Sequence, residues 1–190
     1  MPNTDYLRYL EELRQIPTLS GFENAGQKEV QQLLAPLFDE SRPAGVSGLL
    51  FTKKCSRENA PVLLIDAHLV EIGLIVTDLK DDGTLTVSSL GGMDARTYTA
   101  SSYTIHGKEN MPALSLKKPY CLGGPEARKL PKNGEFWLFT GFTKEELIQK
   151  GVAVGTPVSM ERSTESLSEE QLCGAYMDDK SCAVAALIGL

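Results

Sequence analysis

The chain has 190 residues, of which 42% are hydrophobic and 23% charged, and its 19 Lys and Arg against 25 Asp and Glu give a net charge of −6. This size and composition are typical of a globular protein that buries a sizeable core without disulfides or a structural metal. The sequence has no Lys/Arg stripe, which argues against binding to nucleic acid. It also has neither a signal peptide nor an apolar run of the roughly 20 residues that cross a bilayer, so we expect a cytoplasmic protein without a membrane partner.

Four cysteines are present, at Cys55, Cys121, Cys173 and Cys182, and none of them forms a C-x-x-C pair. Their spacing predicts reduced thiols that pack as small apolar side chains. The final residues 181–190 are apolar helix formers with no cap or breaker after them. We therefore expect the sequence to stop inside a helix.

Two amphipathic helices are predicted before any strand. Apolar residues recur at helical spacing up to Leu13, Pro17 ends this pattern, and a second apolar stripe covers residues 30–37. Residues 49–53 are predicted to form an outer strand. Residues 62–65, Val-Leu-Leu-Ile, form a continuous apolar run that is typical of a strand buried on both faces, so we expect them to be a central strand of a helix-covered sheet.

The pattern changes from about Ile72 to short segments with alternating apolar positions. Such segments cover residues 74–79, 85–90, 98–105 and 136–139, with turn residues between them, and predict a compact barrel-like or sandwich-like insert. Thr143 and Glu146 predict a capping box for a short helix over residues 143–150. Residues 152–160 and 171–176 are expected to return toward the first sheet, and residues 180–190 to begin a helix.

Two places in the sequence could carry chemistry. His68 follows the predicted strand 62–65, and ligands of open α/β sheets bind beyond the carboxyl ends of strands. Asp178 and Asp179 stand at a predicted strand-to-helix junction, where the helix dipole favours negative charge. Each feature taken alone also has an ordinary interpretation, a histidine at the rim of the core and an Asp that caps a helix.

Both places resemble motifs of metallopeptidase family 42 in clan MH, which includes glutamyl and deblocking aminopeptidases. HLVEIG at residues 68–73 is similar to the family's H-M-D-E-I/V-G, and YMDDK followed by SCAV is similar to its W/L-D-N/D-R-x-G-C-A-V. The stretches LRQIPTLSGFE, GGMDARTYTASSYTIHGKENMPAL and FTKEELIQKGVAVGTPV appear in the family's order as well. The chain is therefore identified as similar to the N-terminal part of such an aminopeptidase.

The resemblance implies an α/β fold in which a zinc-exopeptidase-like α/β/α catalytic domain, incomplete here, is interrupted by a β-rich, barrel-like dimerisation domain. Residues 1–71 would form the first segment of the catalytic domain, residues 72–162 the dimerisation insert, and residues 163–190 the return into the catalytic domain. The resemblance also implies a homo-oligomer built from dimers.

The function implied by the resemblance is removal of N-terminal residues from oligopeptides at a centre of two divalent metal ions, Zn or Co. His68 matches the family's ligand to one metal, and Asp178 matches the carboxylate that bridges both. The family's general-base Glu and its remaining Glu, Asp and His ligands belong to a C-terminal half with no counterpart in this sequence. We therefore expect no catalytic residue in the chain and no appreciable activity of the chain alone.

Two differences from the family motifs concern residues around the metal ligands. Val70 replaces an Asp that supports the metal site, and Asp66, two residues before His68, could substitute for it if both lie on one strand. Lys180 stands where the family usually has Arg, whose bidentate fork an ammonium does not reproduce; the alternative is a solvated lysine at a helix start. Glu71 is expected to hydrogen-bond within its loop.

These differences keep a second function open, a catalytically degraded relative that acts as an oligomerising or peptide-binding protein. Glycoside hydrolysis, sometimes assigned to members of the family, is a weaker alternative because no pair of carboxylates is arranged for it. His106 is expected to be structural, and Phe136, Trp137, Phe139 and Phe142 to form a core or dimer-interface cluster.

Overall fold

The computed structural model describes residues 3–115, 120–123, 125, 129–132, 136–169 and 171–189. The chain divides into two compact units, one made of Met1–Glu71 with Arg162–Leu190 and the other of Ile72–Glu161. Arg162 thus belongs to the first unit, whereas the sequence placed it at the end of the insert. Its guanidinium binds Glu71, which belongs to the same unit.

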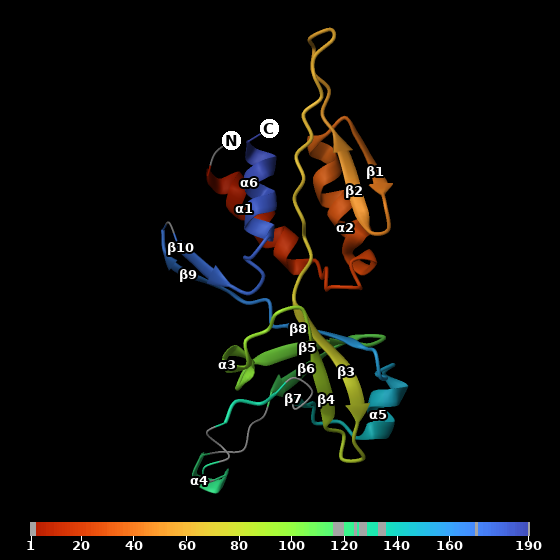
Figure 1. The fold of residues 1–190 in the computed structure, drawn as a ribbon, viewed down its shortest axis with the longest axis vertical. Helices are drawn as coiled ribbons and strands as arrows, with labels where there is room; N and C mark the ends of the chain where they lie inside the picture. Colours follow the sequence, from red (N-terminus) through yellow and green to blue (C-terminus); the bar gives the residue numbers. More distant parts are fainter. Residues whose placement is uncertain are drawn as a thin grey trace. The chain divides into compact units, whose positions relative to one another are not determined.

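The first unit contains three helices around one core. These are α1 (Asn3–Gln15), α2 (Asn24–Leu34), which continues into the 3-10 turn η1 (Ala35–Leu37), and α6 (Lys180–Ile188). Helices α1 and α6 lie side by side (Figure 1). The core is formed by side chains of these three helices and by Ile16, which follows α1: Tyr9, Leu10, Leu13, Ile16, Val30, Leu34, Ala183 and Val184. The two N-terminal helices predicted from apolar spacing are confirmed.

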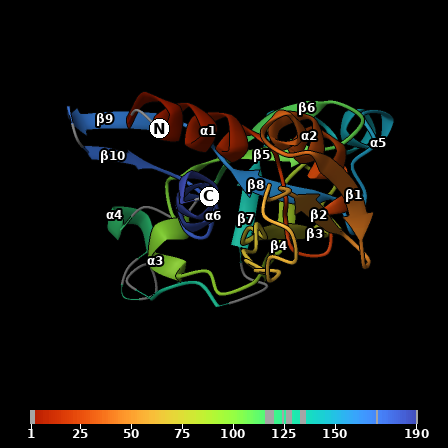
Figure 2. The ribbon, with the colours of Figure 1, turned by 90° about the horizontal axis from the view of Figure 1, so that it is seen from above.

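The strands of the first unit form two separate antiparallel hairpins. Strand β1 (Glu40–Ala44) pairs with β2 (Gly48–Thr52), which lies beside α2 (Figure 2). Strand β9 (Thr164–Ser168) pairs with β10 (Gln171–Gly174). The expected outer strand over residues 49–53 is therefore part of a hairpin. Of the predicted stretch 171–176, only residues 171–174 form a strand, and they pair with β9 instead of joining a first sheet.

The central strand predicted over residues 62–65 is wrong. Residues 53–70 form no strand, and Figure 1 draws this stretch without an arrow. Val62, Leu63 and Leu64 are 96%, 80% and 74% exposed. A strand buried on both faces needs hydrogen-bonded neighbours and covering helices, and neither hairpin of this unit pairs with the segment. Pairing resumes at Glu71, which forms an isolated parallel bridge with Leu19.

The second unit is a closed six-stranded barrel in the order β3-β4-β7-β6-β5-β8, with antiparallel neighbours. Its strands are β3 (Gly73–Leu79), β4 (Leu85–Leu90), β5 (Ser102–His106), β6 (Asn110–Ser115), β7 (Phe136–Phe139) and β8 (Pro157–Met160). Short helices α3 (Ala95–Tyr98), α4 (Tyr120–Gly123) and α5 (Lys144–Gln149) complete the unit. The barrel-like insert and the Thr143–Glu146 capping box are confirmed.

Buried and exposed residues alternate along the strands, because successive side chains of a strand point to opposite faces. The buried side chains fill the barrel interior. On β7, Phe136 and Leu138 are buried while Trp137 and Phe139 are about half exposed. Phe142 packs against the barrel core from the following loop. The predicted aromatic cluster is therefore divided between the two faces of the barrel wall.

Two tyrosines in the barrel core give the second unit an expected alkaline limit. Burial raises the pKa of Tyr98 well above its usual range and that of Tyr103 to about 12. A tyrosine whose folded pKa is raised stabilises the fold below its unfolded pKa of about 10 and loses this contribution as the pH rises through the folded value. We expect the urea midpoint for unfolding of the second unit to be constant up to about pH 10 and to fall above it. Tyr103→Phe should reduce the fall; an unchanged fall would contradict this origin.

The four cysteines do not pack as predicted. All of them are free and exposed, so their expected role as small apolar core side chains is wrong. They also lie in different elements, from the stretch after β2 to α6.

Among the described residues, no helix is both long and apolar enough to span a membrane.

Candidate metal centre

His68 and Asp179 come together in the first unit. Nε2 of His68 lies 3.0 Å from Oδ2 of Asp179, and their side chains are 63% and 31% exposed. His68 belongs to the extended stretch before Glu71, while Asp179 directly precedes α6. An imidazole and a carboxylate at this distance, both open to solvent, are a ligand pair that divalent transition metals bind.

The turn before α6 has an unusual backbone. Tyr176 and Asp179 have φ values of 61° and 64°, in a region that side chains other than glycine rarely adopt. Asp179 precedes the first helical residue but makes no side-chain cap to α6, so its carboxylate is available to His68. Such backbone strain persists only where the surrounding structure holds it in place.

A buried cluster of charges lies directly beside this turn; we call Glu71, Lys180, Arg162 and Arg14 the charge cluster. The Glu71 carboxylate accepts two hydrogen bonds from the Arg162 guanidinium, at 2.7 and 2.8 Å, and a third from Lys180 Nζ. It also accepts a bond of 3.1 Å from the backbone N–H of Thr18. Glu71 is thus held from several sides, by partners that lie outside the loop in which its hydrogen bonds were expected.

Lys180 is completely buried, so its interpretation as a solvated lysine is wrong. Besides Glu71, its ammonium donates to the carbonyl oxygens of Leu13 and Ile16, at 3.0 and 2.7 Å. These carbonyls stand at the C-terminal end of α1, where the last turn leaves acceptors without partners and the helix dipole favours cations. Lys180 therefore joins the start of α6 to the end of α1 and uses all three of its N–H donors.

Arg14 extends the charge cluster to the β9–β10 hairpin. Its guanidinium, also fully buried, donates to the carbonyl oxygens of Ala175 at 2.6 Å and Ser163 at 3.2 Å. A Cβ added to Gly174 would lie 2.4 Å from Nη2 of Arg14 and 2.8 Å from the Ser163 oxygen. The glycine is thus required by the close approach of the arginine.

The ionisation of the charge cluster follows from its surroundings. Burial alone would raise the pKa of Glu71, but the hydrogen bonds and charges of Arg162 and Lys180 outweigh it and hold the pKa below its usual value. Burial lowers the pKa of Lys180 to about 8 against the opposing attraction of Glu71. At neutral pH the pair is therefore a carboxylate and an ammonium.

The other site residues predicted from the sequence lie on the same two segments. Asp178 is exposed and adjacent to Asp179, Asp66 is exposed, and Val70 is half-buried. Because residues 53–70 form no strand, the argument that Asp66 shares a face with His68 does not hold. Across the described ranges, no three His, Cys, Asp or Glu converge as metal ligands. The His68–Asp179 pair fits a divalent ion in chemical type but supplies fewer ligands than a closed site needs.

Sequence reasoning named Asp178 and Asp179 as a pair but gave the metal role to Asp178 alone, and it did not single out the two arginines of the charge cluster. The acidic pair 178–179 was visible in the sequence, but the backbone geometry that turns the second carboxylate toward His68 was not. Arg14 did leave a signal, since it stands four residues after Leu10 on the apolar stripe of α1. A charged residue on such a stripe is either misplaced or paired in the core.

Two other features of the second unit are less suitable as reaction sites. Nδ1 of His106 lies 3.0 Å from Asn110 Oδ1, and its Nε2 lies 2.9 Å from Ser159 Oγ. This order resembles a nucleophile with its base, but Ser159 is fully buried in β8 and no substrate could reach it.

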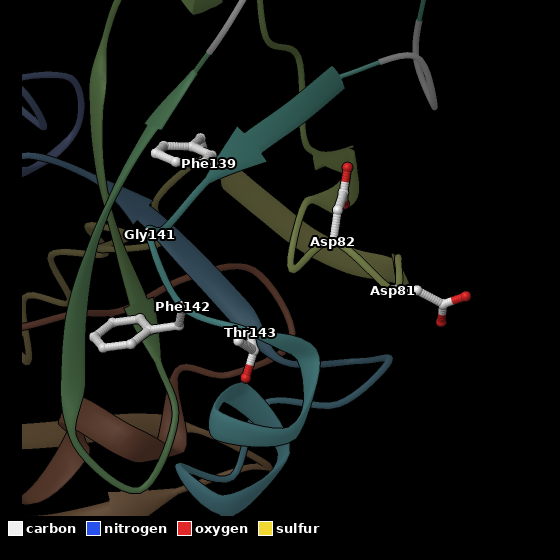
Figure 3. A pocket seen from close by; sticks show the side chains of 6 residues that line it. All are labelled: Asp81, Asp82, Phe139, Gly141, Phe142 and Thr143. Atoms are coloured by element: carbon white, nitrogen blue, oxygen red, sulfur yellow. The ribbon is translucent and has the colours of Figure 1, made fainter.

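An open hollow between the β3–β4 turn and the loop before α5 is the other feature, lined by Asp81, Asp82, Phe139, Gly141, Phe142 and Thr143 (Figure 3). Asp81 at its rim is paired with Lys144 at 2.7 Å. The hollow contains neither imidazole nor thiol, and its second carboxylate, Asp82, accepts a hydrogen bond from the backbone N–H of Thr84. It therefore offers no set of groups comparable to His68 and Asp179.

Comparison with known proteins places both candidate segments in one family. The family model described as M42 glutamyl aminopeptidase matches residues 48–190, which include His68, Glu71 and Asp178 to Lys180. The chain belongs to the M42 aminopeptidase family. The glutamyl aminopeptidase of Lactococcus lactis is 30% identical over 112 residues, which are 59% of this chain and 30% of that protein.

Solved structures of two archaeal peptidases share the fold. An aminopeptidase from the archaeon Desulfurococcus kamchatkensis has a TM-score of 0.86 at 24% identity and is matched over 98% of this chain and 52% of its own. The TET1 peptidase of Pyrococcus horikoshii has a TM-score of 0.79 at 21% identity, over 97% of this chain and 56% of its own. The chain thus spans about half the length of these structures.

Proposed function

We propose that this M42 chain carries one side of a di-metal aminopeptidase centre, with His68 as a ligand of one ion and Asp178 as the bridging carboxylate. The observation that supports this most is the 3.0 Å approach of His68 to Asp179, which brings the two M42 segments together in the first unit. Asp179 is the neighbour of Asp178 through which the two segments meet.

The chemistry of these groups suits the proposal. A neutral imidazole and a carboxylate are good ligands for Zn²⁺ or Co²⁺, and a carboxylate can bridge two ions. When bound, such ions polarise a scissile carbonyl and lower the pKa of a water between them. The chain's own part is to hold His68 and the two aspartates open to solvent on a buried support. The remaining ligands and the general base would come from outside residues 1–190, so this chain alone should not hydrolyse peptides.

The proposed substrates are oligopeptides with a free N-terminal amine, in keeping with the names of M42 relatives. We also propose that the first unit is part of a zinc-exopeptidase-like α/β/α domain and that the barrel is a dimerisation insert. The TET1 peptidase is described as assembling into a tetrahedron or a large octahedral shell. By analogy, this protein would act as a cytoplasmic homo-oligomer.

A metal titration tests the proposed function. The chain has two histidines, so NMR signals of their rings can be assigned from one His68→Ala variant. Co²⁺ should broaden the His68 ring signals and leave those of His106, which lies in the barrel, unchanged. Amino acid release from an unblocked peptide should stay at background for residues 1–190. Equal broadening of both rings, or broadening of neither, would contradict the metal site.

Val70→Asp should strengthen metal binding if the centre is functional. The M42 motif has an Asp at this position, and loss of such a supporting carboxylate typically costs 10–100-fold in affinity or activity. We expect the Co²⁺ concentration for half-broadening of His68 to fall about tenfold or more in the variant. Val70→Asn, which has the same shape without the charge, is the matched control. A degraded relative that only binds peptides would show no gain from either substitution.

A further inference from the structure

We infer that Glu71 and Lys180 are positioning residues that set the distance between His68 and the Asp178–Asp179 turn. The inference rests on the proposed function for its catalytic meaning, but its structural content concerns contacts within the chain itself. Both candidate metal segments lead directly into the charge cluster. Glu71 follows His68 by three residues, and Lys180 follows Asp179.

The first step concerns the segment that carries His68. Glu71 is fixed to the loop after α1 by its backbone as well as its side chain: its N–H donates to the Thr18 oxygen at 2.9 Å, and its carbonyl accepts from the Ser20 N–H at 3.0 Å. The Thr18 hydroxyl donates in turn to the Leu69 carbonyl. The residues just after His68 are therefore held on a fixed support, although residues 62–68 themselves are exposed.

The second step concerns the turn that carries the aspartates. Lys180 is the first residue of α6, and its ammonium reaches the end of α1 and the Glu71 carboxylate at once. Within the turn, Ser181 N–H bonds the Met177 oxygen at 3.1 Å and Ala183 N–H bonds the Asp179 oxygen at 2.9 Å. A displacement of Lys180 would therefore move Asp178 and Asp179 with it.

The third step weighs the contacts against one another. The His68–Asp179 pair is largely exposed, and an exposed pair contributes little because water screens it. It cannot by itself hold two segments in a strained arrangement. The Glu71–Lys180 contact is completely buried, and its side chains have full sets of partners. The single carboxylate of Glu71 thus joins the support of His68 to the support of the aspartates.

The experiment compares the imidazole ¹⁵N signals of His68 in metal-free variants at one pH. Asp179→Ala removes the carboxylate that contacts His68 and therefore provides the reference signals for an imidazole without this contact. Lys180→Met should move the His68 signals toward that reference, while the His106 signals stay in place. Lys180→Arg, which keeps the charge and its attraction to Glu71, should return them toward wild type. Leu34→Ala, in the same helical core but outside the charge cluster, is the control for destabilisation and should leave His68 unchanged.

Should Lys180→Met not fold, Glu71→Gln provides the same comparison, because its amide still accepts from the Thr18 N–H while losing its charge. A folded variant of either kind whose His68 signals match wild type would overturn the inference, and so would an equal change in Leu34→Ala. A Co²⁺ titration then separates the two proposals. Lys180→Met should need at least tenfold more Co²⁺ than wild type to broaden His68. If wild-type His68 ignores Co²⁺, the metal site fails while the metal-free comparison still decides the positioning role.

Discussion

Glu71→Leu should lower the free energy of unfolding of the first unit by about 3–5 kcal/mol, the typical cost of removing one partner from a buried ion pair. The carboxylate is almost completely buried and accepts from both Arg162 and Lys180. Without it, a buried ammonium and a nearly buried guanidinium face each other with no counter-charge. Urea unfolding followed by far-UV circular dichroism measures the loss, because α1, α2 and α6 all belong to this unit.

Two further variants show whether the cost arises from unpaired charge. Adding Lys180→Met to Glu71→Leu should recover part of the stability, since an apolar pair of similar volume often replaces a buried ion pair without loss. Glu12→Gln removes the exposed carboxylate that pairs with Arg8 at 3.1 Å on α1 and should change stability little. Additive costs in the double variant would contradict the coupling of Glu71 with Lys180.

The barrel strands that could be predicted from the sequence are those with local alternation and clear turns. Residues 85–90 and 136–139 match β4 and β7 to the residue, because each side of the barrel wall demands its own type of side chain. Strand β6 was missed because Pro112 interrupts its pattern and proline is disfavoured within sheets. The structure tolerates this proline because the ladder between β6 and β7 includes only Leu114 and Ser115 of β6.

The segment 62–65 shows that an apolar run does not specify which strands and helices will lie beside it. Its sequence indicates a strand that favours burial, but burial depends on neighbours that the run does not specify. Among the described residues the nearby strands pair within their own hairpins, and the apolar side chains stay exposed. Local pattern therefore predicted the preference of the segment and not its surroundings.

The candidate site was predictable to the extent that its motifs are contiguous. His68, Glu71 and the 176–180 stretch were found from short motifs, whereas their joint dependence on Arg14 and Arg162 spans about 150 positions of sequence. No local pattern reports that a lysine at the start of one helix serves as the cap of another. Only the folded chain shows that Lys180 is buried and that all three of its N–H donors have acceptors.

Phe136→Ala should destabilise the barrel by about 3–5 kcal/mol, the range observed when a buried aromatic side chain is truncated. Phe136 is 2% exposed, and its ring centroid lies 4.2 Å from that of Tyr98. The chain's one tryptophan, Trp137, is the next residue on β7, so its fluorescence reports the unfolding of this unit specifically.

Phe139→Ala is the matched control on the same strand. Its side chain is 47% exposed on the outer face, so its truncation leaves no cavity inside the barrel and should cost much less than Phe136→Ala. The difference between the two variants measures the burial that alternation creates, because both remove the same atoms from one strand. Equal costs would mean that both faces of β7 are buried in solution, for example by a second subunit against the exposed pair Trp137 and Phe139. The dependence of the fluorescence midpoint on protein concentration would then identify that association.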